Sequence, residues 1–221
     1  MAQSPAVDTT QSIDTVRTKQ PIIAANVIQS RPLTFILGFD VSRPILAVIE
    51  QNYLSLEAMA GIGWGKTYLA AELGYVNRIL PQNAYEISTS GSYFRLGLEK
   101  NAFDDPANKL FYGMRLAGCT GVYNPRNIRV NNDPFTGEQT TANFMNAQSL
   151  SAFWLEVVSG LQVEVLSHIQ IGFTLRAKFK LNQSDYNTVP YNWLPGYGSA
   201  RNNTSLGLNY YIIYELSGGK K

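Results

Sequence analysis

From about residue 31 onward, apolar and polar residues alternate with a period of two, which is typical of β-strands whose two faces meet different environments. The clearest segment is 169–181, where odd positions are apolar and even positions are polar or glycine. At about 3.3 Å per residue and a tilt of about 40°, a strand of this length crosses a hydrocarbon layer. Strands of soluble proteins average only about five or six residues. The segment therefore favours a membrane-spanning strand.

Seven further segments carry the same alternation with differing clarity. They are residues 33–41, 53–64, 67–76, 85–100, 110–122, 153–163 and 204–216. The connections 63–66, 101–108 and 166–167 are short, whereas 42–52, 124–149 and 182–203 are longer and 78–83 is intermediate. Short turns at one end and long loops at the other are typical of outer-membrane barrels. The pattern predicts an all-β, antiparallel, up-and-down transmembrane barrel of about eight strands, with its short turns in the periplasm.

Alternation alone does not separate this barrel from a soluble barrel or sandwich whose apolar face is its core. Glycines on the polar face favour the membrane barrel. They are Gly38, Gly61, Gly74, Gly97, Gly113, Gly160, Gly172 and Gly207. Strand glycines exposed to water weaken a sheet, but glycines facing a narrow lumen make room for long neighbouring side chains.

Composition agrees with a single barrel domain preceded by a tail. Residues 1–30 are largely polar and predict a flexible periplasmic tail, whereas residues 31–221 form the barrel. No apolar run reaches the roughly 18 residues of a spanning helix, so membrane residence depends on strands. The net charge of +2 provides no field for nucleic acid. An outer-membrane location also requires an export leader that is cleaved from the chain.

Five short motifs resemble an uncharacterised outer-membrane barrel family of the Bacteroidota, known as a domain of unknown function. The motifs are GFDVSRP at 38–44, GSYFRLGL at 91–98, GFTLRAK at 172–178, LPGYG at 194–198 and NYYIIY at 209–214. The resemblance covers roughly residues 31–216. It implies an eight-stranded outer-membrane barrel without known catalytic residues, and it leaves open a place in a larger assembly such as the barrel-insertion machinery. The C-terminal sequence ELSGGKK departs from the terminal aromatic residue common in such barrels.

Charged residues of both signs share the predicted inward face. The expected lumen charge network consists of Asp40, Glu57, Glu72, Arg95, Glu99, Arg115, Glu156, Arg176, Lys178 and Glu215, with Glu164 and Lys180 on the same face. Eight strands enclose an interior that side chains can fill. We therefore expect a salt-bridged plug, and the alternative is a narrow polar or proton-conducting path.

Candidate catalytic, cofactor and metal residues are scarce. His168 is the only histidine, and it is adjacent to Ser167 in a predicted turn, where neighbouring residues rarely form a nucleophile and base pair. Cys119 is the only cysteine, which excludes an internal disulfide, and Asp104 with Asp105 resembles turn chemistry. We expect no enzyme, no cofactor and no metal. A lipid-modifying outer-membrane enzyme is the alternative.

Two loop segments carry the remaining functional expectations. Tyr186, Tyr191, Trp193 and Tyr197 lie among prolines and glycine, which indicates either a rigid partner-binding loop or an interfacial aromatic girdle. Residues 44–50 predict a short amphipathic helix whose apolar surface requires membrane or a partner subunit. The expected function is a non-enzymatic outer-membrane scaffold that contacts lipid and other outer-membrane proteins. A narrow channel and a soluble binding barrel are further alternatives.

Overall fold

The structure is a computed structural model that describes residues 33–50, 52–81, 86–103, 108–126, 128–131, 139–142, 146–186 and 190–217. All described elements belong to one unit, Arg31–Lys221. The tail expected at residues 1–30 lies outside the described residues.

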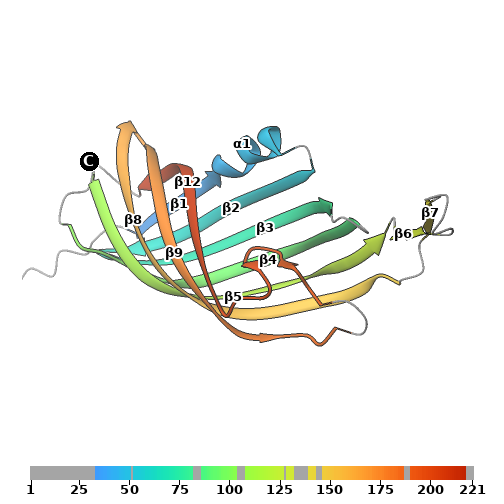
Figure 1. The fold of residues 1–221 in the computed structure, drawn as a ribbon. Helices are drawn as coiled ribbons and strands as arrows, with labels where there is room; N and C mark the ends of the chain where they lie inside the picture. Colours follow the sequence, from blue (N-terminus) through green and yellow to red (C-terminus); the bar gives the residue numbers. More distant parts are fainter. Residues whose placement is uncertain are drawn as a thin grey trace, which may run out of the picture. The chain divides into compact units, whose positions relative to one another are not determined.

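Eight strands close into a barrel, in which every strand pairs antiparallel with both of its neighbours (Figure 1). The barrel strands are β1 (Leu33–Asp40), β2 (Tyr53–Trp64), β3 (Thr67–Pro81), β4 (Glu86–Asn101), β5 (Asn108–Arg126), β8 (Gln148–Leu166), β9 (Ile169–Gln183) and β12 (Thr204–Ser217). The ring runs β1-β12-β9-β8-β5-β4-β3-β2 and closes through pairing of β1 with β2. The predicted eight-stranded, up-and-down barrel is confirmed.

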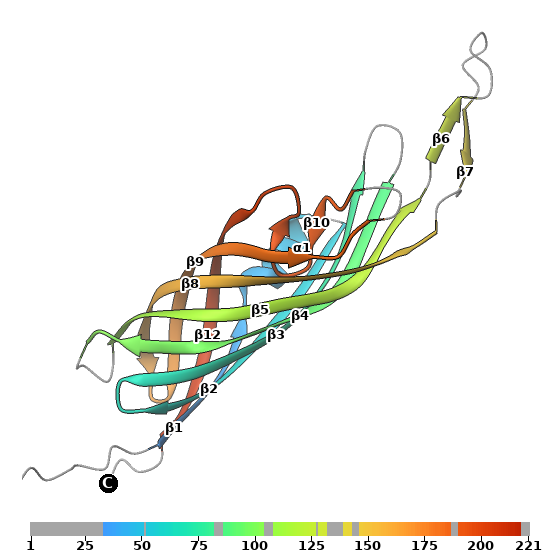
Figure 2. The same ribbon diagram turned by 90° about the horizontal axis from the view of Figure 1, so that it is seen from below.

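The two ends of the barrel differ in their connections. The turns 65–66 and 167–168 join strands at the end where β1 begins and β12 finishes, which we call the turn end. Gly65 and His168 adopt positive φ angles of 69° and 72° in these turns. The opposite end, the loop end, carries helix α1 (Ser42–Ile49) and two hairpins, β6–β7 (Ile128–Asn131 and Gln139–Ala142) and β10–β11 (Trp193–Leu194 and Gly198–Ser199). Figure 2 shows the β6–β7 hairpin continuing beyond the ends of β5 and β8.

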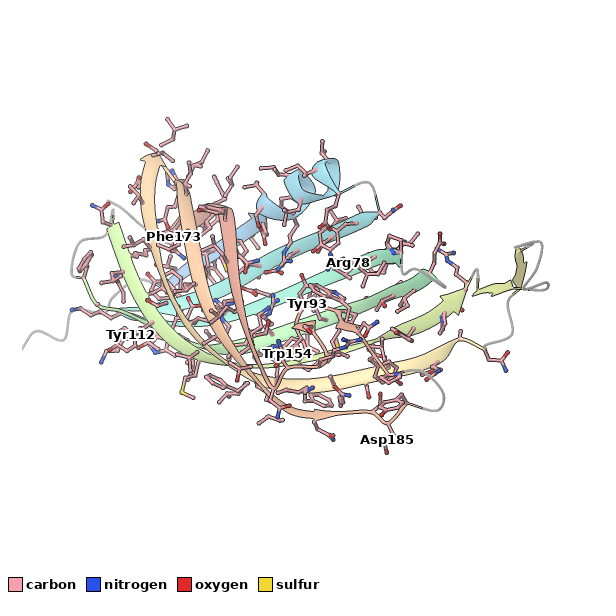
Figure 3. The ribbon with its side chains drawn as sticks, in the orientation of Figure 1. Arg78, Tyr93, Tyr112, Trp154, Phe173 and Asp185 are labelled. Atoms are coloured by element: carbon pink, nitrogen blue, oxygen red, sulfur yellow. The ribbon has the colours of Figure 1, made fainter. Side chains whose placement is uncertain are left out.

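Side chains alternate between an apolar outer surface and a mostly polar interior. Along β2, every odd position from Tyr53 to Gly63 is buried and every even position from Leu54 to Trp64 is exposed. Among the large apolar residues of the barrel strands, Leu73 is 68% exposed and Leu206 is 75% exposed. In Figure 3, Tyr93 and Trp154 project inward, whereas Tyr112 and Phe173 lie on the outside. The apolar face is therefore the outer face of the barrel, which is the reverse of a soluble β-barrel.

Inward glycines provide the space that large lumen side chains occupy. A Cβ atom on Gly74 would collide with the ring of Tyr93. The side chain of Arg115 fills the space beside Gly97, where its Cγ would lie 2.6 Å from an added Cβ. Gly207 faces Lys178 in the same way, with Cε at 3.1 Å. The barrel interior is thus packed, because glycine on one strand faces a long side chain on the next.

The lumen is filled by three successive zones. At the loop end, an apolar cluster includes Tyr53, Ile87, Tyr123, Leu150, Trp154 and the loop residues Tyr191, Leu194 and Tyr197. Charged side chains occupy the middle of the strands. Near the turn end, a smaller apolar cluster contains Ile36, Met59, Tyr211 and Ile213. The candidate functional site is the charged middle zone, enclosed by apolar groups on both sides.

Candidate functional site: the charged lumen

Glu72 of β3 is the centre of the charged zone. Its carboxylate accepts from Arg95 Nη1 at 2.8 Å and from both terminal nitrogens of Arg176 at 2.9 Å. Arg115 is the third arginine that donates to the same carboxylate, through its Nη1. Three guanidinium groups therefore share one acid, and all four side chains are at most 1% exposed. One carboxylate cannot neutralise three guanidinium groups. Because an unpaired buried charge is costly, this cluster requires further acidic side chains.

Arg95 and Arg176 connect the centre to two more carboxylates. Arg95 lies 2.9 Å from Glu57 through Nη1 and 3.0 Å from Glu156 through Nε. Arg176 Nη1 contacts Glu156 at 3.2 Å, and its Nε donates to Asn209 Oδ1 at 2.8 Å. Fork-shaped guanidinium groups suit such multiple contacts, because they present several donors in a fixed plane. The network links strands from around the whole barrel.

Aromatic donors complete the coordination of the two outer carboxylates. Tyr93 donates its hydroxyl to Glu57 at 2.5 Å, and Tyr211 donates to the other oxygen of Glu57. The Trp154 indole N–H donates to Glu156 at 2.7 Å. These donors supply hydrogen bonds that buried carboxylates need in addition to ion pairs.

The network extends to the loop end through Asp40 and α1. Asp40 accepts from the amide and hydroxyl groups of Ser42, at 2.8 and 2.5 Å, and from Arg43 Nε at 3.2 Å. Asn209 also donates to Asp40. Burial on its own lowers the pKa of the Arg43 guanidinium, but the nearby Glu57 carboxylate raises that pKa above its ordinary value. Arg43 consequently stays charged.

Opposite charges are balanced within this zone. Its acids are Asp40, Glu57, Glu72, Glu99 and Glu156, and its bases are Arg43, Arg95, Arg115, Arg176 and Lys178. Nine of the ten residues expected in the lumen network lie in this zone or against it. The tenth, Glu215, lies apart near the turn end, where Lys109 Nζ reaches it at 2.5 Å and Gln170 at 2.7 Å. The sequence hypothesis does not include Lys109 because this residue precedes the predicted strand, although it has the same parity as Arg115.

The loop between β9 and β12 closes the lumen at the loop end. Lys178 Nζ donates to the carbonyl oxygens of Gly196 and Tyr197 at 2.8 and 3.1 Å, and Arg95 donates to Gly196 at 3.1 Å. Gly196 has a φ angle of 72°, which favours glycine, and an added Cβ would collide with Tyr93. These contacts could not be predicted from the sequence, because the acceptors are backbone carbonyl oxygens, which every residue type carries.

The aromatic residues of this loop are mostly turned inward. Tyr191 and Tyr197 are 3% and 1% exposed, and they pack edge to face against Tyr123 and Trp154 at ring distances of 5.3 and 5.6 Å. Trp193 is partly buried beneath the Arg78 guanidinium, 4.4 Å from the ring centroid. Only Tyr186 of the four is largely exposed, at 49%. Of the four residues of the candidate partner-binding loop, Tyr191 and Tyr197 therefore do not present their rings at the surface, because both rings fill the barrel mouth.

The candidate residues for other chemistry are not assembled into a site. His168 and Ser167 are exposed in the β8–β9 turn, where the His168 ring lies 6.2 Å from the Tyr214 ring. Cys119 is free and buried among lumen side chains. Within the described ranges, no group of three or more histidine, cysteine or acidic residues is placed to hold a metal ion. Asp104 and Asp105 lie outside these ranges.

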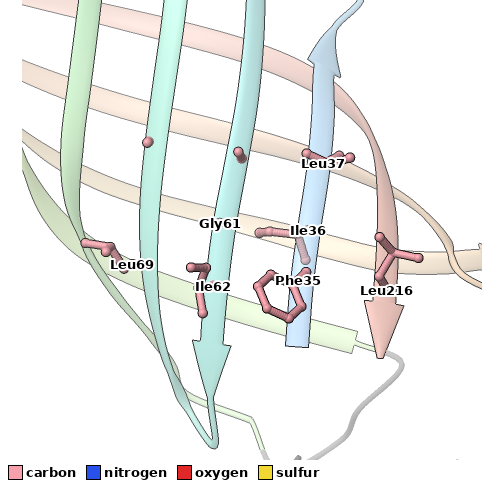
Figure 4. A pocket seen from close by; sticks show the side chains of 9 residues that line it. Phe35, Ile36, Leu37, Gly61, Ile62, Leu69 and Leu216 are labelled. Atoms are coloured by element: carbon pink, nitrogen blue, oxygen red, sulfur yellow. The ribbon is translucent and has the colours of Figure 1, made fainter. Parts of the chain in front are cut away.

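The outer wall carries an apolar groove of about 390 Å³ (Figure 4). It is lined by Phe35, Ile36, Leu37, Ala60, Gly61, Ile62, Leu69, Ala71 and Leu216, from β1, β2, β3 and β12. Small side chains in the middle and larger ones at the edges give it depth. Its lining offers no group for acid–base or nucleophilic chemistry.

In the part of the chain that the structure describes, no helix has the length and apolar character to cross a bilayer. The fold and the lumen define a class: a closed eight-stranded barrel with an apolar exterior and an ion-paired, filled interior. The chain belongs to the family described as a domain of unknown function, DUF6048, whose family model matches residues 2–221. No curated protein and no solved structure matches the chain.

Proposed function

We propose that this protein is an integral outer-membrane β-barrel that acts as a non-enzymatic structural or partner-binding scaffold. The observation that carries the proposal is the inverted distribution of side chains, with apolar residues outside and paired charges inside. Large apolar side chains are more than one third exposed on all eight barrel strands. Monomeric soluble proteins rarely expose contiguous apolar patches beyond about 300–600 Å². A lipid environment removes the free-energy cost of exposing this apolar surface to water.

Aromatic residues near the turns support a membrane boundary at that end. Trp64, Tyr112 and Tyr214 point outward and are 49%, 53% and 47% exposed. Each lies within a few residues of the turn end of its strand. Outer-membrane barrels carry aromatic girdles at this level, because amphipathic rings prefer the headgroup region.

The filled lumen favours a scaffold over a channel. A solute passing through the barrel would have to displace the loop residues Gly196 and Tyr197 and then separate Glu72 from three arginines. Breaking one buried ion pair already costs about 3–5 kcal/mol. The same contacts make the barrel rigid, which suits a protein that presents loops to partners. We infer that those partners are other outer-membrane proteins.

The first experiment tests membrane residence and partnership together. The tagged full-length protein is extracted from its native outer membrane in mild detergent, and co-purifying proteins are identified by mass spectrometry. We expect extraction to require detergent, an electrophoretic mobility that changes on boiling, and stoichiometric outer-membrane partners. Recovery of the unboiled protein in the soluble fraction would refute the membrane proposal, and a pure monomer would limit the function to a structural barrel.

Planar bilayer recordings separate the scaffold from a channel. The purified barrel should give no conductance above that of the bare bilayer. Reproducible unitary currents would contradict a closed lumen. Loss of lipid remodelling upon His168→Ala would instead support the lipid-modifying enzyme.

A further inference from the structure

The barrel wall is incomplete along β1 at the loop end. The last pairs of β1 with its neighbours are Phe39 with Ala58 of β2 and Asp40 with Tyr211 of β12. Residues 53–57 of β2 and 204–210 of β12 therefore extend beyond the ladder that β1 provides. With eight residues, β1 is shorter than the roughly 9–11 residues of a typical spanning strand. The gap leaves strand edges that another element must cover.

Helix α1 follows directly at this gap and contacts both flanking strands (Figure 1). The Val41 amide donates to the Tyr210 carbonyl at 2.8 Å, which continues the contact with β12 by one residue. Pro44 lies in the first turn of the helix, where a missing amide hydrogen is tolerated. At the other end, the Tyr53 amide donates to the Glu50 carbonyl at 3.1 Å and leads into β2.

The polar residues at both ends of α1 bind the barrel. Arg43 donates to Asp40 at 3.2 Å and to the Tyr53 hydroxyl at 3.2 Å. Glu50, directly after the helix, pairs with Arg78 of β3 at 3.4 Å. The helix is therefore fixed at both ends, and its rotation about its own axis is determined by charged contacts to the wall.

The rest of the helix is apolar and exposed. The exposed fractions are 58% for Ile45, 42% for Leu46, 85% for Val48 and 71% for Ile49. This surface carries no charge and no hydrogen-bonding side chain. It continues the outer apolar surface of the flanking strands, where Leu54 of β2 and Leu206 of β12 are 46% and 75% exposed.

We propose that α1 lies in the lipid leaflet at the boundary between acyl chains and headgroups, where it completes the barrel wall beyond the end of β1. This inference rests on the proposed membrane function. Lipid is the favoured occupant because the exposed helix surface is continuous with the outer apolar surface and offers no polar group to a protein partner. Covering the exposed edges of β2 and β12 also matters most in lipid, where unsatisfied backbone groups are costly.

Spin-label accessibility tests the position of the helix. Val48→Cys is prepared in a Cys119→Ala background, labelled with a nitroxide and reconstituted into phosphatidylcholine vesicles. Molecular oxygen partitions into lipid, whereas a nickel chelate stays in water. We expect the label at position 48 to collide more with oxygen than with the chelate. Leu73→Cys on the outer wall is the lipid-facing reference, and Tyr186→Cys is the water-exposed reference.

The references distinguish the two proposals. Preferential contact of both position 73 and position 48 with the chelate would refute the membrane proposal itself. Oxygen contact at 73 combined with chelate contact at 48 would overturn only the helix inference. A label at 48 that is shielded from both reagents would overturn it too, because it would show that the helix surface is buried against protein. If replacing Cys119 impairs folding, Val48→Trp in the natural background gives the same readout, because brominated lipids should quench its added fluorescence.

Discussion

Arg176 and Glu72 form a bidentate ion pair across the full width of the barrel. Both terminal nitrogens of Arg176 lie 2.9 Å from the two oxygens of Glu72. Their strands, β9 and β3, are four positions apart in the ring of eight, so they face each other. The pair therefore connects opposite walls of the barrel, and the ion pairs around it connect the remaining strands across the lumen.

Neutralising the central acid should strongly destabilise the barrel. Glu72→Gln keeps the shape of the side chain but leaves Arg95, Arg115 and Arg176 without their shared counter-charge. We expect a loss of about 3–5 kcal/mol in the free energy of unfolding, because uncompensated buried charges are costly. Denaturant titration of the reconstituted protein, followed by tryptophan fluorescence, measures this loss.

Glu164→Gln is the matched control, because Glu164 faces the same interior but is only partly buried near the turn end. Its effect should stay within about 0.5 kcal/mol. The double variant Glu72→Gln/Arg176→Gln restores the charge balance, so it should lose less than the sum of its single variants, by about 0.5–3 kcal/mol. Equal losses for Glu72→Gln and Glu164→Gln would show that the network does not stabilise the barrel.

A methyl group at Gly74 should disturb the barrel more than one at Gly207. The added Cβ of Gly74→Ala meets the Tyr93 ring, which is held by its hydrogen bond to Glu57. We expect a loss of about 1–3 kcal/mol from overpacking. Gly207→Ala instead meets the flexible end of Lys178 and should lose less. Unfolding titrations compare the two, and a larger loss at Gly207 would argue against a ring fixed over Gly74.

An arginine on the outer wall should distinguish lipid from water. Leu73 is 68% exposed near the middle of β3. If that surface faces acyl chains, Leu73→Arg should destabilise the barrel by about 2–4 kcal/mol, whereas Val165→Arg, beside the β8–β9 turn, should lose at most about 1 kcal/mol. Unfolding from phospholipid vesicles measures both. Similar small effects at the two positions would indicate that the outer wall contacts water.

Removing the Lys178 amine should release the loop that closes the lumen. Lys178→Met loses the donors to the Gly196 and Tyr197 carbonyls, each worth about 1.5–3 kcal/mol for a charged group. We expect faster trypsin cleavage after Arg201, which is exposed in the same loop. Lys100→Met, on the outer face of β4, is the control. Unchanged cleavage in the Lys178 variant would show that other contacts hold the loop.

Strand positions and facing directions could be predicted well from alternation. The eight predicted segments all lie within or largely overlap barrel strands, and the inward positions of Glu72 and Arg176 follow from parity alone. The ends of the longest strands could not be predicted. β5 and β8 extend to 108–126 and 148–166, beyond the predicted 110–122 and 153–163. Backbone pairing continues there after the apolar pattern fades, because a hydrogen-bonded ladder does not require an apolar face.

The burial of the loop residues could not be predicted from the sequence. Tyr191 and Tyr197 have the composition of an exposed binding loop, yet both are buried against lumen aromatics. The Tyr191 hydroxyl donates to the Ser149 carbonyl, the Tyr197 carbonyl accepts from Lys178, and both rings fill space beside Tyr123 and Trp154. Neither backbone acceptors nor empty volume is visible in a residue pattern.

The barrel class, the number of strands and the inward-facing charges follow from the order of residues, because the two-residue period of a strand assigns every side chain to one of two faces. Which of these charges form ion pairs depends on the closed barrel. Barrel closure brings β3 opposite β9 and so joins Glu72 to Arg176 across 104 positions of sequence. Which side chains pair across the closed barrel depends on strand tilt and register, and these properties arise only when all eight strands pair.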